Sequence, residues 1–455
     1  MQSMAATEDA RAFWQQVYER FDPETPAIQS TWRAERPYSP RDVINAGLKR
    51  PFGTEKQYAV LGTVGTGKTT ELLAIAEEQT RQRMVVFLDV WRHFQEQVGD
   101  ATALHHVQPW EILFLIGLTV YRSARELLGH VWTDEHLEAF EGAVRVFVDT
   151  GQTRVGKSDG DRALDVAKLA TKIVALAGSA VDGGTGIALR ALGAATSAGR
   201  WNIRLGERGR VSLSDQDDRV RGLLNAVNLL IGTLQQRYQK LVIVVDGLDR
   251  INNEDTTRGL FVESTLLGSL SCATVLTGPL TLRRRRMAAR MRHFEPRVLA
   301  NVPVLDHREP GKPGPGIAFF LDIYRRRVAQ IVHGGMGIPE PFLHELAYYS
   351  GGRARDFIRL VRMCAERAWD RAVPRVDRPI IDACIDERRR LMEMSLNRGH
   401  IQVLQEVMRD PQHLLPENEL VEELLDQWCL LPFPNESEWY YPHPLLTLKL
   451  VPITG

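Results

Sequence analysis

The stretch Gly62-Thr63-Val64-Gly65-Thr66-Gly67-Lys68-Thr69-Thr70 decides how the rest of the chain is interpreted. It matches the pattern G-x-x-x-x-G-K-[ST], in which backbone N–H groups of a glycine-rich loop surround phosphate oxygens. Residues 56–61 before it have the apolar character of a buried strand, and residues 72–76 after it have an apolar helical face. Strand, loop and helix in this order are the context that the motif requires. The stretch therefore predicts a nucleoside triphosphate site rather than a glycine-rich turn that happens to contain a lysine.

The residue types within this loop have separate tasks. Its glycines permit positive φ and bring N–H groups close to an anion at the positive end of a helix dipole. We expect the Lys68 ammonium to contact the β- and γ-phosphates of ATP and the Thr69 hydroxyl to bind Mg²⁺. The predicted cofactor-binding set is Gly62, Thr63, Val64, Gly65, Thr66, Gly67, Lys68, Thr69 and Thr70.

Length and composition indicate a large globular chain with no dominant charge. The 455 residues and 44% hydrophobic content allow two or three domains. Lysine plus arginine (57) balances aspartate plus glutamate (57), so any attraction to nucleic acid has to be local. The cysteines form no C-x-x-C pair, which argues against a disulfide framework and a zinc site; they are Cys272, Cys364, Cys384 and Cys429. Since residues 1–20 also lack the apolar region of a signal peptide, we expect a cytoplasmic protein.

The segment 166–198 is rich in small and apolar residues and is the one candidate for a membrane span. Charged residues such as Lys172, Asp182 and Arg190 leave no run of about 18 uncharged apolar residues. We expect two small-residue helices broken near Gly183, ahead of an inducible membrane or oligomer contact, and no membrane partner.

A strand-length apolar run at 240–245 ends in Asp246. A buried strand followed by an aspartate, downstream of a phosphate-binding loop, is the pattern whose carboxylate helps to hold Mg²⁺. We assign Asp246 to the metal site together with Thr69. Asp249 has two interpretations: it orients the attacking water, which we favour, or it caps the following helix.

The run at 240–245 is separated from an earlier strand, residues 84–90, by about 150 residues. Helical patterns at 110–128, 135–148 and 218–238 occupy much of this interval. It is far longer than a connection between a strand and a helix needs, so we treat residues 91–240 as a helical insertion.

Residues 273–276 predict the next strand, which ends in the polar Thr277. An arginine cluster follows: Arg283, Arg284, Arg285, Arg286, Arg290, Arg292 and Arg297. Three interpretations stay open for it, namely an arginine finger for a neighbouring subunit's nucleotide, contact with nucleic-acid phosphates, and a solvated helix face.

Residues 298–304 predict a last core strand, before a linker rich in proline and glycine at 310–316. Helical patterns at 319–332 and 341–349 come next. The pair Gly351-Gly352 then breaks one helix and starts another, which places Arg355 in the first helical turn. From there its guanidinium is a candidate to fold back onto a nucleotide.

The last 60 or so residues predict a winged helix, with helices at 401–408 and 418–428 and strands at 429–433 and 439–441. Winged helices often bind DNA, but the sequence from Ser395 onward contains nine acidic residues and three basic ones. The presumed recognition helix carries only acids, which a phosphate backbone repels: Glu417, Glu419, Glu422, Glu423 and Asp426. We expect a protein contact or a nucleotide-gated lid.

The chain resembles the AAA+/STAND group of P-loop ATPases, of the kind found in bacterial conflict and anti-phage systems. The resemblance is carried by residues 62–70, by residues 242–250, by Thr277, and by Ser350-Gly351-Gly352-x-x-Arg355 before the winged helix. Similarity to origin-recognition-like ATPases implies Thr277 as sensor 1, Arg355 as sensor 2, and an α/β fold whose parallel sheet has the strand order 5-1-4-3-2. Asp246, Asp249, Thr277 and Arg355 form the predicted catalytic set.

One residue departs from this pattern. Gly247 stands where the AAA+ form has an acid directly after Asp246, and the order Asp-Gly-Leu-Asp is closer to NACHT and related STAND proteins, which often act as switches. The departure predicts slow hydrolysis. The expected domains are an N-terminal helical segment (1–55), an ATPase core (56–310) with its insertion (91–240), a helical lid (311–392) and a winged helix (393–455).

The function that follows is an ATP-binding and ATP-hydrolysing regulatory switch or oligomerisation platform, with anti-phage defence as its setting. We expect a homo-oligomer with an effector or sensor protein as partner. The alternative is a DNA-binding ATPase of the initiator or transposition-regulator kind, which would grip DNA through residues 283–297. A small-molecule kinase is the poorest of the three hypotheses, because nothing in the sequence resembles an acceptor site.

Overall fold

The computed structural model describes residues 2–50, 56–149, 205–210, 212–238, 240–283, 285–331, 334–434 and 438–452. The small-residue helices predicted within 166–198 lie outside the described residues. The chain divides into two compact units. We call Pro40–Gly62 with Glu71–Val298 the sheet unit, and Met1–Ser39 with Thr63–Thr70 and Leu299–Gly455 the C-terminal unit. Each unit is described by itself.

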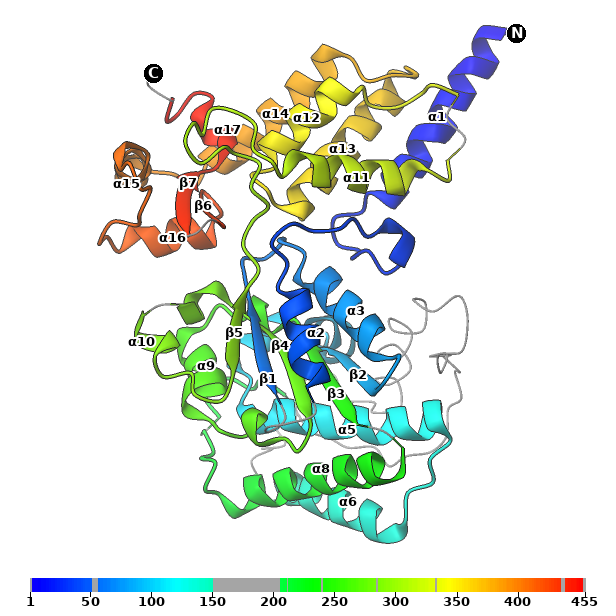
Figure 1. Ribbon diagram of the computed structural model, residues 1–455, viewed down its shortest axis with the longest axis vertical. Helices are drawn as coiled ribbons and strands as arrows, with labels where there is room; N and C mark the ends of the chain where they lie inside the picture. The colour runs from blue at the N-terminus through cyan, green and yellow to red at the C-terminus, as the bar shows by residue number, and fades with distance from the viewer. Residues whose placement is uncertain are drawn as a thin grey trace, which may run out of the picture. The chain divides into compact units, whose positions relative to one another are not determined.

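A parallel five-stranded sheet forms the centre of the sheet unit (Figure 1). Its strands lie side by side in the order β2-β3-β4-β1-β5, which is the predicted order 5-1-4-3-2 read from the other edge. Because all the strands run parallel, their carboxyl ends meet at one edge of the sheet. The strands are β1 Gln57–Leu61, β2 Met84–Asp89, β3 Leu241–Asp246, β4 Ala273–Gly278 and β5 Glu295–Val298.

The central strands are largely apolar because both faces of the sheet are covered. Every residue of β1, β3 and β4 is buried, as expected for a parallel sheet between helical layers. Their inward side chains share one hydrophobic core with α5 Pro109–Leu128 and α8 Asp218–Arg237. With α6 Asp134–Asp149, these helices confirm the helical character predicted for the described part of the insertion.

Shorter helices complete the sheet unit. They are α2 Arg41–Lys49, α4 Val90–His93, α9 Glu254–Arg258 and α10 Arg285–Ala288, together with most of α3 Lys68–Gln79. The helix α3 begins directly after the glycine-rich loop, as the motif requires.

The strand predicted at 298–304 is wrong. The fifth strand, β5, is already complete at Val298, and residues 299–304 belong to the C-terminal unit. Two of their backbone amides bond to residues of the C-terminal unit and not to the five-stranded sheet: Asn301 N donates to Pro432 O (3.2 Å) and Val302 N to Gly352 O (2.9 Å). The apolar run is buried, but in the core of the C-terminal unit.

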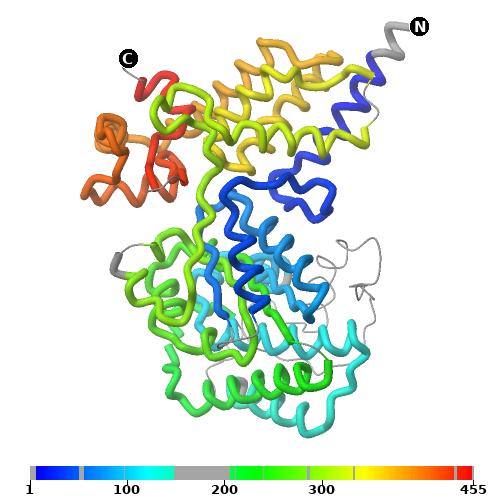
Figure 2. The backbone as a smooth tube through the Cα atoms, viewed as in Figure 1, coloured from blue at the N-terminus to red at the C-terminus, as the bar shows by residue number. Residues whose placement is uncertain are grey.

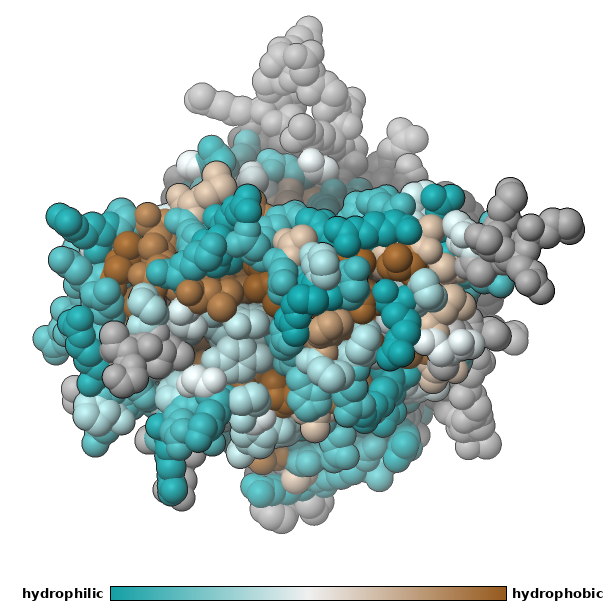
Figure 3. Space-filling model, turned by 90° about the horizontal axis from the view of Figure 1, so that it is seen from above, coloured by the Kyte–Doolittle hydropathy of each residue, from teal (hydrophilic) through white to brown (hydrophobic). Residues whose placement is uncertain are grey.

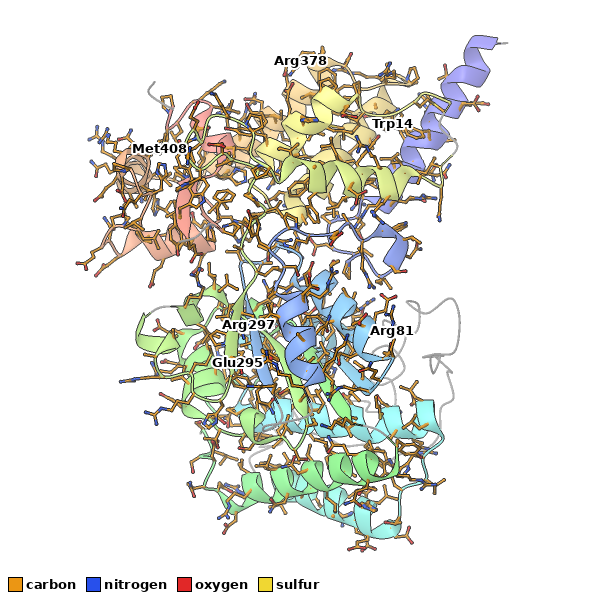
Figure 4. All side chains as sticks on the ribbon, in the orientation of Figure 1. Trp14, Arg81, Glu295, Arg297, Arg378 and Met408 are labelled. Atoms are coloured by element: carbon orange, nitrogen blue, oxygen red, sulfur yellow. The ribbon has the colours of Figure 1, made fainter. Side chains whose placement is uncertain are left out.

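Helices build most of the C-terminal unit (Figure 2). The N-terminal helix α1 Gln2–Arg20 packs against α13 Ala354–Asp370, so segments far apart in sequence lie side by side. Trp14 lies on α1 (Figure 4), and its indole Nε1 donates to Val373 O, just after α13, at 2.6 Å. The other helices are α11 Ile317–Val328, α12 Glu340–Tyr349 and α14 Arg378–Glu393.

The end of the chain forms the predicted winged helix. Its hairpin pairs β6 Leu430–Phe433 antiparallel with β7 Trp439–Pro442. The helices around it are α15 Arg398–Arg409, α16 Leu420–Asp426 and α17 Pro444–Thr447. The five acidic residues counted above in and before α16 are all exposed, so the negative face that argued against DNA binding is a real surface.

All four cysteines are free thiols buried in the cores.

Hydrophilic residues predominate on the molecular face drawn in Figure 3, with hydrophobic residues gathered in smaller groups among them. Among the described residues, no helix has the length and apolar character needed to cross a membrane.

Candidate functional site

The glycine-rich loop has the backbone conformation that its sequence predicts. It leaves β1 at Leu61 and enters α3 at Lys68. Gly65 and Gly67 have φ of 93° and 102°, in the left-handed region that side chains other than glycine's rarely adopt. Two such residues in front of a twelve-residue helix form the backbone nest that anions occupy.

The loop carbonyls are held by donors of the C-terminal unit, to which residues 63–70 belong. Arg353 Nη2 donates to Val64 O (2.5 Å), the backbone N of Arg355 to Gly65 O (3.1 Å), and Arg36 Nη1 to Thr66 O (2.6 Å). In a trans peptide the carbonyl and the next N–H point in opposite directions. The N–H groups of residues 65 and 67 are therefore turned away from these donors, as phosphate binding requires.

Lys68 and Thr66 close the same loop from inside. The Lys68 ammonium is buried and donates to Thr63 O at 2.7 Å, and the Thr66 hydroxyl donates to the same carbonyl at 2.9 Å. The lysine thus already lies within the loop. These features fit the triphosphate of ATP: Lys68 and the loop amides would hold it, and Thr69 at the start of α3 would be the metal ligand.

Arg353, two residues before Arg355, directs its side chain to the loop. Its fully buried guanidinium bonds Val64 O, pairs with the Asp356 carboxylate and lies 4.1 Å from the centre of the Trp428 ring. Burial lowers the pKa of Arg353 to about 10, against the Asp356 charge, which raises it.

The side chain of Arg355 takes a different direction. Its Nε donates to Pro23 O at 3.2 Å and its Nη2 lies 3.6 Å from the Glu24 carboxylate. Arg355 is the second residue of α13, as predicted, and it reaches the loop through its backbone amide. Its role as a sensor of nucleotide stays a prediction.

The glycine pair before α13 is required by close packing. A Cβ atom on Gly352, at φ of 77°, would lie 2.0 Å from Val302 O. A Cβ atom on Gly351, at φ of 63°, would lie 2.5 Å from a Leu431 methyl carbon and 2.7 Å from His443 Nε2. The turn that presents Arg353 therefore depends on both glycines.

In the sheet unit, two carboxylates end neighbouring strands. Asp246 ends β3 and is buried, and the strand register pairs it with Asp89 at the end of β2. Burial raises the pKa of Asp89, while the Arg92 amide and the Arg250 charge oppose the shift. Both strands end at the same edge of the sheet as β1, after which the loop begins.

Thr277 is fully buried, and its hydroxyl accepts a hydrogen bond from the backbone N of Leu248 at 3.1 Å. It therefore positions the turn that follows Asp246 and carries Asp249. The next helix, α9, is capped by Asn253, whose Oδ1 accepts from Thr256 N at 2.9 Å. The cap that was the alternative role for Asp249 is thus supplied by another residue.

Gly247, the residue that departs from the AAA+ pattern, has φ of 89°. A Cβ atom there would lie 2.6 Å from Trp91 N and 2.7 Å from Trp91 Cβ. Trp91 in turn lies beneath the Arg250 guanidinium, 4.6 Å from the ring centre. An acidic side chain at position 247 has no room here.

No protein-family model matches this chain. No curated protein matches it either. Three solved structures illustrate how similar this chain is to proteins of known structure. The ORC1 protein of Aeropyrum pernix in complex with DNA is 11% identical, with a TM-score of 0.36 over 90% of this chain and 90% of that chain. Drosophila ORC bound to DNA is 11% identical, with a TM-score of 0.38 over 95% and 89% of the two chains.

The RuvB Holliday junction branch migration motor of Thermotoga maritima is 12% identical, with a TM-score of 0.25 over 49% of this chain and 74% of that chain. At these identities and TM-scores the matches carry no functional argument. The fold assignment rests instead on the strand order, the loop after β1 and the buried aspartate that ends β3.

The arginine cluster is divided among different environments. Arg290 and Arg292 are exposed, whereas Arg297 lies on β5 beside Glu295 (Figure 4), with its Nη2 2.9 Å from that carboxylate. Arg284 lies outside the described residues, as do the side chains of Arg285 and Arg286.

Sequence reasoning missed Arg36 and Arg353. Both act on backbone carbonyls of the loop, and a carbonyl acceptor leaves no residue-type signal in a sequence. The position of Arg353 directly after the glycine pair was the one available clue.

Proposed function

We propose that this chain is an ATP-binding and slowly hydrolysing regulatory ATPase of the AAA+/STAND kind, in which nucleotide sets a conformational switch. The observation that carries the proposal is the capture of three consecutive loop carbonyls by Arg353, Arg355 and Arg36. Elements of the C-terminal unit thereby hold the loop, and a change in the loop on binding phosphate is transmitted to them.

The proposed roles follow from position. Lys68 and the loop amides would bind phosphate oxygens, and Thr69 and Asp246 would hold Mg²⁺. Asp249 would orient the water, and Thr277 would fix the turn that carries it. Bound ATP would supply the phosphoanhydride bond whose cleavage resets the switch. Slow turnover follows from the missing acid at position 247.

The winged helix fits a protein partner better than DNA. The acids in and before α16 are exposed, so this helix would repel a phosphate backbone. We infer a cytoplasmic homo-oligomer that recruits an effector or sensor protein, and anti-phage defence is the setting that the resemblance suggests.

A DNA-binding ATPase is the second candidate, and the exposure of Arg290 and Arg292 favours it. Exposed arginines bind phosphates in a manner that weakens steeply with salt. On this account, neutralising both arginines abolishes salt-sensitive binding to duplex DNA.

The distinguishing experiment is light scattering of the full chain with Mg²⁺ and a non-hydrolysable ATP analogue, with and without duplex DNA. A mass increase that needs nucleotide and not DNA supports the switch. Assembly only on DNA supports the second candidate, and a monomer under all conditions contradicts self-assembly as the output of the switch.

A further inference from the structure

We propose that Arg353 is a positioning residue that couples the phosphate-binding loop to the winged helix through stacking on Trp428. The proposal deepens the function above and rests on nucleotide binding at residues 62–70. It assigns to the winged helix a direct influence on ATP affinity, so that a partner protein bound there tunes the loop.

One guanidinium makes all the contacts on which the coupling depends. Arg353 Nη2 donates to Val64 O at 2.5 Å, and Nη1 pairs with the Asp356 carboxylate. The face of the same group lies 4.1 Å from the Trp428 ring centre. Since the guanidinium is planar and rigid, moving the indole moves the donor that holds the loop.

The charge of Arg353 is buried and needs partners that stabilise it. Arg353 is fully buried, and burying a charge is costly unless partners surround it. Asp356 is the partner, and it is shared: Arg359 Nη1 and Arg388 Nη2 each lie 3.3 Å from its Oδ1. The cluster leaves Arg353 one charged partner on α13 and one aromatic partner in the winged helix.

The backbone conformation at the end of α16 fixes the position of the Trp428 side chain. Trp428 follows α16 and has φ of 62°, a left-handed conformation that is rare for a bulky residue. This left-handed residue closes the helix, since Trp428 N donates to Leu425 O (3.2 Å) and Cys429 N to Leu424 O (2.9 Å). Here the position is the one that sets the indole against Arg353.

The expected consequence is that Trp428, which contacts the Arg353 guanidinium, affects nucleotide binding. Without the indole, the guanidinium loses one of the two surfaces that orient it, and Val64 O loses a fixed donor. The N–H group of Gly65 is then less well directed at phosphate, because the peptide plane that it shares with Val64 O is free to rotate.

The test is a double-mutant cycle on the dissociation constant of a non-hydrolysable ATP analogue with Mg²⁺, measured by calorimetry on the full chain. We expect Arg353→Met and Trp428→Leu each to weaken binding about tenfold, and the double variant to be no weaker than Arg353→Met alone. Independent losses that multiply in the double variant, or no effect of Trp428→Leu, would overturn the coupling.

Arg362→Met is the matched control. Arg362 lies on the same helix, stacks on Tyr18 at 4.0 Å and bonds the Asp22 carboxylate at 2.8 Å, but it makes no described contact with residues 63–70. It should leave the dissociation constant unchanged. A loss as large as that of Arg353→Met would show that damage to α13, and not the loop contact, is responsible.

Hydrogen exchange in nucleotide-free protein separates this proposal from the proposed function. The amides of Thr66 and Arg355 bond to Thr63 O and Gly65 O, so they report the order of the loop directly. Trp428→Leu should speed their exchange about tenfold while the melting temperature stays within a few degrees of wild type. Unchanged exchange overturns the coupling, whether or not the wild type binds ATP.

Discussion

A Cβ atom on Gly247 would lie 2.6 Å from the backbone nitrogen of Trp91. This contact explains why position 247, directly after Asp246, is a glycine here, whereas the AAA+ form that the chain resembles has an acid there. Trp91, the second residue of α4, occupies the space that a side chain at position 247 would need. The φ of 89° at Gly247 also disfavours any residue other than glycine. With no acid at position 247, Asp249 is the residue that we propose to orient the attacking water.

We predict that Gly247→Ala lowers the free energy of unfolding by at least about 2 kcal/mol, through the clash and the left-handed conformation together. Chemical denaturation measures it. Gly232→Ala, inside α8 with nothing within 4 Å of the added methyl, is the control and should stabilise by up to about 1 kcal/mol. Equal effects of the two substitutions would refute the steric account.

Asp246→Ala should abolish ATP hydrolysis while the protein still binds nucleotide, because a buried metal ligand is lost. Asp249→Asn should lower kcat with little change in KM, since it removes a group that acts on water and not on ATP. Steady-state phosphate release measures both. Asp255→Asn serves as control, because this α9 carboxylate is 80% exposed and should be neutral. Wild-type turnover by the Asp246 variant would exclude the assigned metal site.

Two buried histidines predict a pH dependence of stability. Burial lowers the pKa of His93 and of His443 to about 3, below the ordinary value of about 6.5 that holds in the unfolded chain. Between these values the unfolded state binds more protons, so stability falls as the pH falls. From pH 7.5 to pH 5.5 each histidine should cost about 1.4 kcal/mol.

Denaturant titrations at the two pH values test this prediction. His93→Leu should remove its share of the slope, and His443→Leu should remove the share of the second ring. A wild-type stability that is flat or rises towards pH 5.5 would mean that these rings accept protons in the folded protein.

Sequence predicted what is local. The apolar runs of β1 to β4, the glycine-rich loop and Asp246 carry their signals within a few residues, and the structure has each strand where the pattern put it. The winged helix was found because its helices and hairpin are short, regular patterns in chain order.

What the sequence did not predict depends on distant backbone groups. Residues 299–304 are as apolar as a strand, but the amides of Asn301 and Val302 bond to Pro432 and Gly352, at least 50 positions along the chain. In the same way, Arg353 could not be preferred over Arg355 because both follow the glycine pair. The three-dimensional structure is needed to see that the Arg353 guanidinium bonds Val64 O and that the Arg355 guanidinium lies beside Glu24.

The central claim is that residues 62–70 bind ATP, and its most direct test is titration calorimetry of wild type and Lys68→Ala with Mg²⁺ and a non-hydrolysable ATP analogue. Lys312→Ala, at an exposed lysine outside the loop, is the control. The account predicts saturable binding by the wild type and by the Lys312 variant, with none by Lys68→Ala. Equal binding by all three proteins, or no binding by the wild type, would contradict it.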